Sequence, residues 1–120
     1  MARLLVHLTS GPEHPTRAAL GFLVARAALE EGHAVTMFLA GDAVQLLRDD
    51  VLDSLVGLGT GRLRDSYDAV AASETRIFAS GMSSKARGLG EADLEGKPVE
   101  LAMPGRLVQL ALEADRVLTY

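Results

Sequence analysis

Short apolar segments alternate with segments of helical periodicity along the whole chain, and this alternation restricts the fold more than any other feature. Five segments are predicted to be strands because each is a short, mainly apolar run bounded by turn residues. They are Arg3–Thr9, Ala34–Ala40, Thr75–Ser80, Pro98–Met103 and Arg116–Tyr120. Strands that are apolar on both faces and alternate with helices are typical of parallel sheets covered by helices on each side. The sequence therefore predicts a three-layer α/β/α fold around a mostly parallel, five-stranded sheet.

The segment after the first strand predicts a long helix. Pro15 suits a first helical turn and Gly32 suits the residue after a helix end. The apolar residues between them form two stripes, which is more apolar surface than a helix on one sheet needs. The stripe assigned to the sheet contains Leu20, Leu23, Val24 and Ala27, and the second stripe, which we expect to contact another subunit, contains Ala18, Phe22, Ala25 and Leu29.

The remaining connections predict shorter elements. Asp42 with Gln45 predicts a capping-box start to a short helix that ends at Leu47. The segment 49–61 carries three glycines among apolar residues and predicts a packed, irregular loop. Helical spacing follows at 63–71, a short helix is expected at 83–88, and a last helix is expected from Pro104 to Ala114.

Composition excludes several kinds of chemistry. The chain has no cysteine, so disulfides, zinc-thiolate sites, iron–sulfur ligation and thiolate nucleophiles are excluded. Its 120 residues, 48% of them hydrophobic, fit a single domain with a proper core. The net charge is −4 and the basic residues are scattered, so neither nucleic acid nor a membrane surface is an expected partner. No apolar stretch approaches the roughly 18 residues of a membrane span, and we expect a cytoplasmic protein.

No metal or cofactor site is expected. His7 lies inside a strand, where we expect a hydrogen-bonded core histidine, and His33 follows a helix end. With His14 in a loop, the three histidines share no metal-ligand spacing. The loop after the first strand lacks both the G-x-G-x-x-G and the Walker patterns, so a phosphate-binding loop is not predicted.

Two loops are the candidate ligand site. In a flavodoxin-like strand order the switch point lies between the first and third strands, and ligands bind there at the carboxyl ends. The loops 9–17 and 80–87 would then face each other across a crevice. The candidate ligand-binding residues are Ser10, Gly11, Glu13, His14, Arg17, Ser80, Gly81, Met82, Ser83, Ser84, Arg87 and Met103.

Each loop also has a purely structural interpretation. In the second loop, free N–H groups with Lys85 and Arg87 could hold a small anion. Alternatively, Ser80 or Ser83 caps the short helix and Arg87 pairs with an acidic neighbour at a subunit contact. A serine nucleophile is not favoured, because the G-x-S-x-G elbow and the Ser-x-x-Lys spacing are both absent.

In the first loop, His14 could act as an acid–base group beside Glu13 and Arg17. The structural interpretation is that Pro12 and Pro15 fix a turn, while Glu13 complements the positive end of the following helix. We favour the structural interpretation of both loops.

Five segments spread over nearly the whole chain carry a family resemblance: Gly11-Pro12-Glu13, Gly32-His33 with Val35-Thr36, Phe38–Asp42, Ser80–Gly88 and Glu113–Val117. In this order and spacing they resemble the DsrE/DsrF-like family, which includes small YchN-like α/β proteins. The resemblance implies a three-layer α/β fold and assembly into trimers or hexamers. In the best-understood members it also implies a cysteine that carries sulfur as a persulfide. Relatives can place that cysteine at the positions of Ser80 and Ser83 here.

The missing cysteine decides which function we expect. A serine hydroxyl has neither the low pKa nor the polarizable sulfur needed to accept and pass on a sulfane sulfur atom. We therefore expect a non-catalytic homo-oligomer, a trimer or hexamer, whose crevice binds a small anion or a partner protein. Two alternatives remain open. One is a small enzyme that uses His14, Arg17, Ser83 and Arg87, and the other is a scaffold in a sulfur-relay complex whose partner supplies the cysteine.

Overall fold

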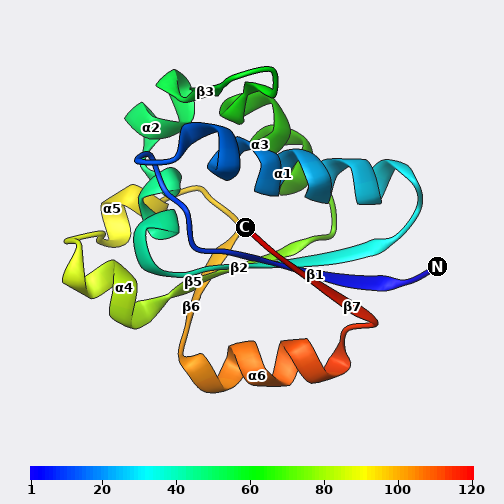
Figure 1. Cartoon of the computed structure of the whole chain (residues 1–120). Helices are drawn as coiled ribbons and strands as arrows, with labels where there is room; N and C mark the ends of the chain where they lie inside the picture. The colour runs from blue at the N-terminus through cyan, green and yellow to red at the C-terminus, as the bar shows by residue number, and fades with distance from the viewer.

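The computed structural model describes residues 1–120 and shows a parallel sheet between two layers of helices (Figure 1). The five strands lie in the order β6-β5-β2-β1-β7, and every neighbouring pair is parallel. Their bounds are Arg3–Leu8 for β1, Ala34–Leu39 for β2, Arg76–Ser80 for β5, Val99–Ala102 for β6 and Arg116–Thr119 for β7. The predicted α/β class and the five-stranded parallel sheet are confirmed.

The strand order differs from the flavodoxin-like order on which the expected crevice depended. β2 lies between β1 and β5, so the first and third predicted strands are not neighbours. The chain leaves β1 toward β2 on one side, whereas β7 pairs with the other side of β1. The switch point therefore falls between the carboxyl ends of β1 and β7.

Helices cover the two faces of the sheet unequally (Figure 1). One face packs against a core cluster of 22 buried residues, and the other against a cluster of four. We call these the thick face and the thin face. The thick face carries α1 (Pro15–Glu30), η1 (Gly41–Leu47), α2 (Asp49–Ser54) and α3 (Leu63–Ala71), the thin face carries α6 (Pro104–Glu113), and α4 (Gly81–Ala86) with α5 (Glu91–Leu94) connects β5 to β6.

The first helix has the predicted bounds but not the predicted contacts. It begins at Pro15, and Gly32 follows its end with a φ of +86°. Ala18, Phe22 and Ala25 of the second stripe are fully buried within the chain, because α3 packs against α1 and Tyr67 lies 5.9 Å from the Phe22 ring. The expectation that this stripe contacts another subunit is therefore wrong. Leu29, the last residue of this stripe, is half-buried, as are Leu20, Leu23 and Val24 of the first stripe, and Ala27 is exposed.

The segment predicted as an irregular loop contains regular elements. After α2, the strands β3 (Val56–Gly57) and β4 (Gly61–Arg62) form an antiparallel hairpin. Gly59 and Gly61 take φ angles of +77° and +76°, which the tight turn requires and which glycine adopts without strain. The irregular-loop prediction was wrong because these elements are too short to produce a periodic signal. None of the helices combines the length and apolar character that crossing a membrane requires.

Candidate functional site

The turn after β1 packs closely against the turn after β2. A Cβ atom on Gly11 would overlap the backbone carbonyl of Asp42, so only glycine fits at this position. The Gly11 amide donates a hydrogen bond of 2.8 Å to Glu13 Oε1, which closes the turn in front of α1. Glu13 thus has a structural role, although it binds the turn amide and not the first amides of the helix.

The two serines of the second loop both accept hydrogen bonds from backbone amides. Ser80 Oγ accepts from the Ser83 amide at 3.1 Å and caps α4, as the structural interpretation predicted. Ser83 Oγ accepts from the Gly41 amide at 2.8 Å. Ser80 and Ser83, the two positions singled out by the family resemblance, thus carry side chains that hold two turns together.

Arg87 fixes the same pair of turns through its side chain. Its Nε donates to Asp42 Oδ1 at 2.9 Å, and its Nη1 donates to the Ser83 carbonyl at 3.2 Å. Arg48 Nη2 in turn donates to the Arg87 carbonyl at 2.8 Å. The predicted acidic partner of Arg87 exists, but it belongs to the same chain. The capping box predicted at Asp42 does not form, since η1 has no side-chain cap and Asp42 pairs with Arg87.

The two predicted loops share one edge of the sheet but are separated by the turn after β2. Their contacts to Asp42, from Gly11 on one side and Arg87 on the other, place the turn after β2 between them. His14 and Arg17 line a hollow that contains no residue of the second loop. The four residues of the enzyme hypothesis are thus divided between two places. Of the other predicted residues, Met82 and Met103 are more than half exposed, Ser10 is buried, and Ser84 is buried with a hydroxyl that has no hydrogen-bond partner.

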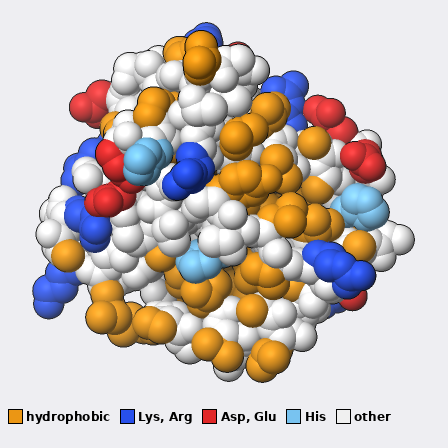
Figure 2. Space-filling view, in the orientation of Figure 1, with side chains coloured by type: hydrophobic (Ala, Val, Ile, Leu, Met, Phe, Trp, Pro, Cys, Tyr) orange, Lys and Arg blue, Asp and Glu red, His pale blue; other side chains and the backbone are white.

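A hollow of about 410 Å³ lies at the switch point, where the carboxyl ends of β1 and β7 meet the start of α1. The backbone holds its wall, since the Thr9 amide and hydroxyl both donate to the Tyr120 carbonyl, at 2.9 and 3.1 Å. Figure 2 shows a histidine with acidic and basic side chains where α1 begins, beside the hydrophobic surface of that helix. This β1–β7 hollow is lined by Glu13, His14, Pro15, Thr16, Arg17, Leu20 and Tyr120.

The β1–β7 hollow contains several groups that can donate hydrogen bonds to an anion. The side chains of His14 and Arg17 are exposed and make no hydrogen bond or ion pair within the chain. The first turn of α1 contains no acidic residue, and the amides of Thr16 and Arg17 belong to the helix start, where intrahelical partners are lacking. Glu13 adds a negative charge, but one of its oxygens is bound to the Gly11 amide. Beside this carboxylate, the unpaired side chains of His14 and Arg17 and the first amides of α1 are free to donate hydrogen bonds.

The sequence did not predict four of the lining residues, Pro15, Thr16, Leu20 and Tyr120, as ligand-binding residues. Tyr120 ends the last predicted strand, so its position at the carboxyl edge was predictable from the parallel sheet alone. Its position beside the first loop was not, because it depends on β7 pairing with β1. Thr16 also carries a structural contact, since its hydroxyl accepts a 3.0 Å hydrogen bond from the Leu58 amide.

His7 lies on the thin face just below this edge. Its ring packs edge-on against Phe38 with 6.2 Å between centroids, and its buried Nε2 has no hydrogen-bond partner. The prediction of a hydrogen-bonded core histidine is wrong for that nitrogen. Burial lowers the pKa of His7 below its ordinary value of 6.5, because a charged imidazole is poorly solvated there. The structure brings no three His, Asp or Glu side chains together as a metal site.

Three comparisons place the chain among known proteins. A sequence model described as the DsrE/DsrF-like family matches residues 2–120, and no curated protein matches the chain. The ychN protein of E. coli has a similar structure, with a TM-score of 0.80 at 18% identity and full coverage of both chains. MTH1491 of Methanobacterium thermoautotrophicum, a protein of unknown function, gives 0.75 at 16% identity with full coverage of both. BT1422 of Bacteroides thetaiotaomicron, also of unknown function, gives 0.65 at 12% identity, covering 99% of this chain and 95% of its own. At these identities the structural likeness concerns the fold.

Proposed function

The chain belongs to the DsrE/DsrF-like family, and we propose that it is a non-catalytic, homo-oligomeric member that binds a small anion in the β1–β7 hollow. The family is related to sulfur-relay proteins, but this chain binds its guest without a covalent bond. The observation that carries the proposal is the pair of unpaired side chains, His14 and Arg17, at the start of a helix whose first turn has no acidic residue.

The residues that replace the sulfur carrier support a non-covalent role. Persulfide transfer needs a thiolate that forms and breaks a sulfur–sulfur bond, and the chain contains no cysteine. The hydroxyls of Ser80 and Ser83 already accept backbone hydrogen bonds at 3.1 and 2.8 Å. Neither serine has a histidine beside it that could act as a base, since His14 lies in the β1–β7 hollow on the other side of Asp42. The second loop therefore has a structural role, since its side chains hold the turn after β2 in place.

Anion binding follows from the groups that remain free in the β1–β7 hollow. The Arg17 guanidinium supplies a fixed positive charge and a planar set of donors that suits carboxylates and phosphates. The first amides of α1 point out of the helix and carry the positive end of its dipole. Tyr120 and Leu20 provide a less polar wall on which the body of a small ligand rests.

Calorimetric titration with inorganic phosphate tests this site. Arg17→Ala is expected to weaken binding at least tenfold, because it removes the one fixed cation of the hollow. Arg26→Ala is the matched control, since Arg26 lies on the same helix and pairs only with Glu30 at 3.1 Å on the surface. If Arg17→Ala binds phosphate as tightly as the unchanged protein, the proposed site is wrong. If no phosphate binds and a tight oligomer persists, the scaffold function gains support.

Homo-oligomerisation is supported by the exposed apolar surface around the thin face. Val108 and Leu112 of α6 are 59% and 82% exposed. They are one helical turn apart, so they form one apolar patch on the same face of the helix. The two outer strands of the sheet, β6 and β7, each leave one edge unpaired. A contact between the β6 side of one copy and the β7 side of the next would cover both edges. Such a contact forms a closed ring, such as a trimer or hexamer, when the rotation from one copy to the next closes. The other exposed apolar residues near these edges are Leu101, Met103 and Val117.

A further inference from the structure

A second cavity lies at the edge of the sheet formed by the amino ends of the strands, opposite the edge that carries the proposed anion site. A single helix that crosses five strands cannot cover the whole thin face, and α6 runs diagonally from the carboxyl end of β6 to the amino end of β7 (Figure 1). The corner at the amino ends of β1, β2 and β5 stays open as a cavity of about 290 Å³. This volume is at the low end of the range for small-molecule pockets, so only a small ligand fits.

The sheet register shows which side chains line this amino-edge cavity. Arg3 and Leu5 lie two residues apart and so share one face of β1. Leu5 pairs with Thr36 of β2, and Thr36 pairs with Arg76 of β5, so these side chains share that face. These side chains share the thin face with Leu110 of α6, because Leu5 and Leu110 belong to its core cluster. The backbone of Arg3 is fixed at both of its polar groups, since its amide donates to Asp115 Oδ2 at 2.8 Å and its carbonyl accepts from the Asp115 amide at 2.8 Å.

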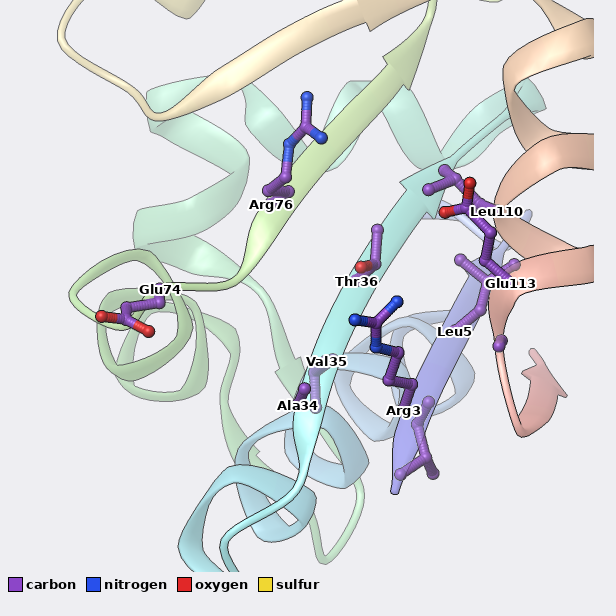
Figure 3. Close-up of a pocket in the computed structure, with 11 residues that line it drawn as sticks. Arg3, Leu5, Ala34, Val35, Thr36, Glu74, Arg76, Leu110 and Glu113 are labelled. Carbon is purple, nitrogen blue, oxygen red and sulfur yellow. The ribbon is translucent and has the colours of Figure 1, made fainter. Parts of the chain in front are cut away.

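Two opposite charges in this cavity are unpaired. Figure 3 shows the Arg3 side chain extending along the sheet toward Thr36, while the Glu113 carboxylate reaches from α6 toward the same space. No ion pair joins Arg3 to Glu113, and neither side chain has another ion-pair partner. The Arg76 guanidinium points away toward β6, where it pairs with Glu100 at 3.2 Å. Glu74 also lines the cavity and has no ion-pair partner, but its carboxylate extends away from the other lining side chains (Figure 3). The free polar groups between β1, β2 and α6 are therefore the Arg3 guanidinium, the Glu113 carboxylate and the Thr36 hydroxyl.

We propose that the amino-edge cavity binds a small zwitterion, a free α-amino acid with a short apolar side chain. The carboxylate of the ligand binds the Arg3 guanidinium and the Thr36 hydroxyl. Its ammonium group binds the Glu113 carboxylate and the carbonyls that follow Leu110 at the end of α6, which lack intrahelical partners and carry the negative end of the helix dipole. Leu5 and Leu110 receive the apolar side chain. A plain anion is disfavoured by Glu113, and a plain cation is disfavoured by Arg3.

An NMR titration of the full chain with L-alanine tests this proposal, with acetate and ethylammonium as probes of one charge each. L-alanine is expected to shift the backbone amides of residues 3–5, 34–36 and 113–115, and each single-charge probe is expected to bind at least tenfold more weakly. Acetate binding as tightly as L-alanine would show a simple anion site and would overturn the proposal. An absence of shifts with all three probes would overturn it as well.

Variants of the two charged residues make the test residue-specific. Arg3→Gln and Glu113→Gln are each expected to reduce L-alanine affinity at least tenfold, and both should fold because these exposed side chains make no contact that holds the chain together. Glu95→Gln, an exposed carboxylate outside the cavity, is the matched control and should bind normally. Arg17→Ala should also bind L-alanine normally, which separates this site from the proposed anion site. Unchanged affinity in both glutamine variants contradicts the assignment.

Discussion

The two faces of the sheet differ in how much helix packs against them, and the residues of β1 show this difference within one strand. Val6 and Leu8 face the larger core cluster and are fully buried, whereas Leu5 and His7 face α6, where the cluster has four residues and His7 stays half-buried. Apolar burial is the main favourable term in folding. The thick face therefore supplies most of the stability, and the thin face keeps surface available for association and for a small ligand.

The largest effect should come from removing matched leucines on the two sides of β1. Leu8→Ala is expected to cost about 4 kcal/mol, because Leu8 packs against Gly21 of α1 in the thick-face core and a cavity there cannot collapse. Leu5→Ala is expected to cost about 2 kcal/mol, since the single helix over it can shift inward. Urea unfolding of the two variants measures the difference. Equal losses would show that the two faces contribute alike.

Arg87→Ala tests the connection between the turns at the carboxyl edge. It removes the ion pair with Asp42, and because both side chains are partly exposed we expect a loss of about 1 kcal/mol. Phosphate binding in the β1–β7 hollow should change little, because Arg87 is not among its lining residues. A loss of phosphate affinity as large as that of Arg17→Ala would mean that the two loops form one site after all.

A smaller effect is expected from His7 on the thin face. Burial lowers the pKa of His7 in the folded protein. Once the pH falls below about 6.5, the unfolded chain therefore binds more protons at His7 than the folded protein does. The contribution of neutral His7 to stability is thus complete above pH 6.5 and decreases as the pH falls through the folded pKa. His7→Gln should flatten this part of the profile between pH 7.5 and 5 in urea unfolding. Parallel profiles for the variant and the unchanged protein would exclude His7 as the cause.

The smallest effect on the folded subunit is expected at the outer surface of α6. Val108→Lys combined with Leu112→Lys should change the stability of the subunit by no more than about 0.5 kcal/mol, because both side chains point to solvent. The same change should lower the mass measured by light scattering, since charges on the proposed contact surface oppose association. Gln109→Lys is the control, because this exposed residue on the same helix is already polar. An unchanged oligomer would move the interface away from α6.

Sequence reasoning predicted the strands and long helices because each produces a local periodic signal. It could not predict the strand order, since right-handed crossovers are compatible with several orders of the same elements. The strand order places the switch point between β1 and β7 and not between β1 and β5, and so brings Tyr120 into the candidate site.

Side-chain partners far apart in the sequence were also missed. Asp42 has the local pattern of a helix cap, but its partner Arg87 lies 45 residues away and is brought close only by the β5 turn. The second stripe of α1 was assigned to another subunit for the same kind of reason, although α3 of the same chain packs against it. A helix with two apolar stripes does not show whether its second neighbour is another subunit or α3 of its own chain.

Mapping where inorganic phosphate binds, from backbone amide shifts in an NMR titration, tests the location of the proposed site most directly. We expect the largest shifts at Thr16, Arg17 and Tyr120, around the start of α1 and the end of β7. Shifts confined to residues 80–87 would contradict it, because they would place the guest in the second loop and leave the β1–β7 hollow without a ligand.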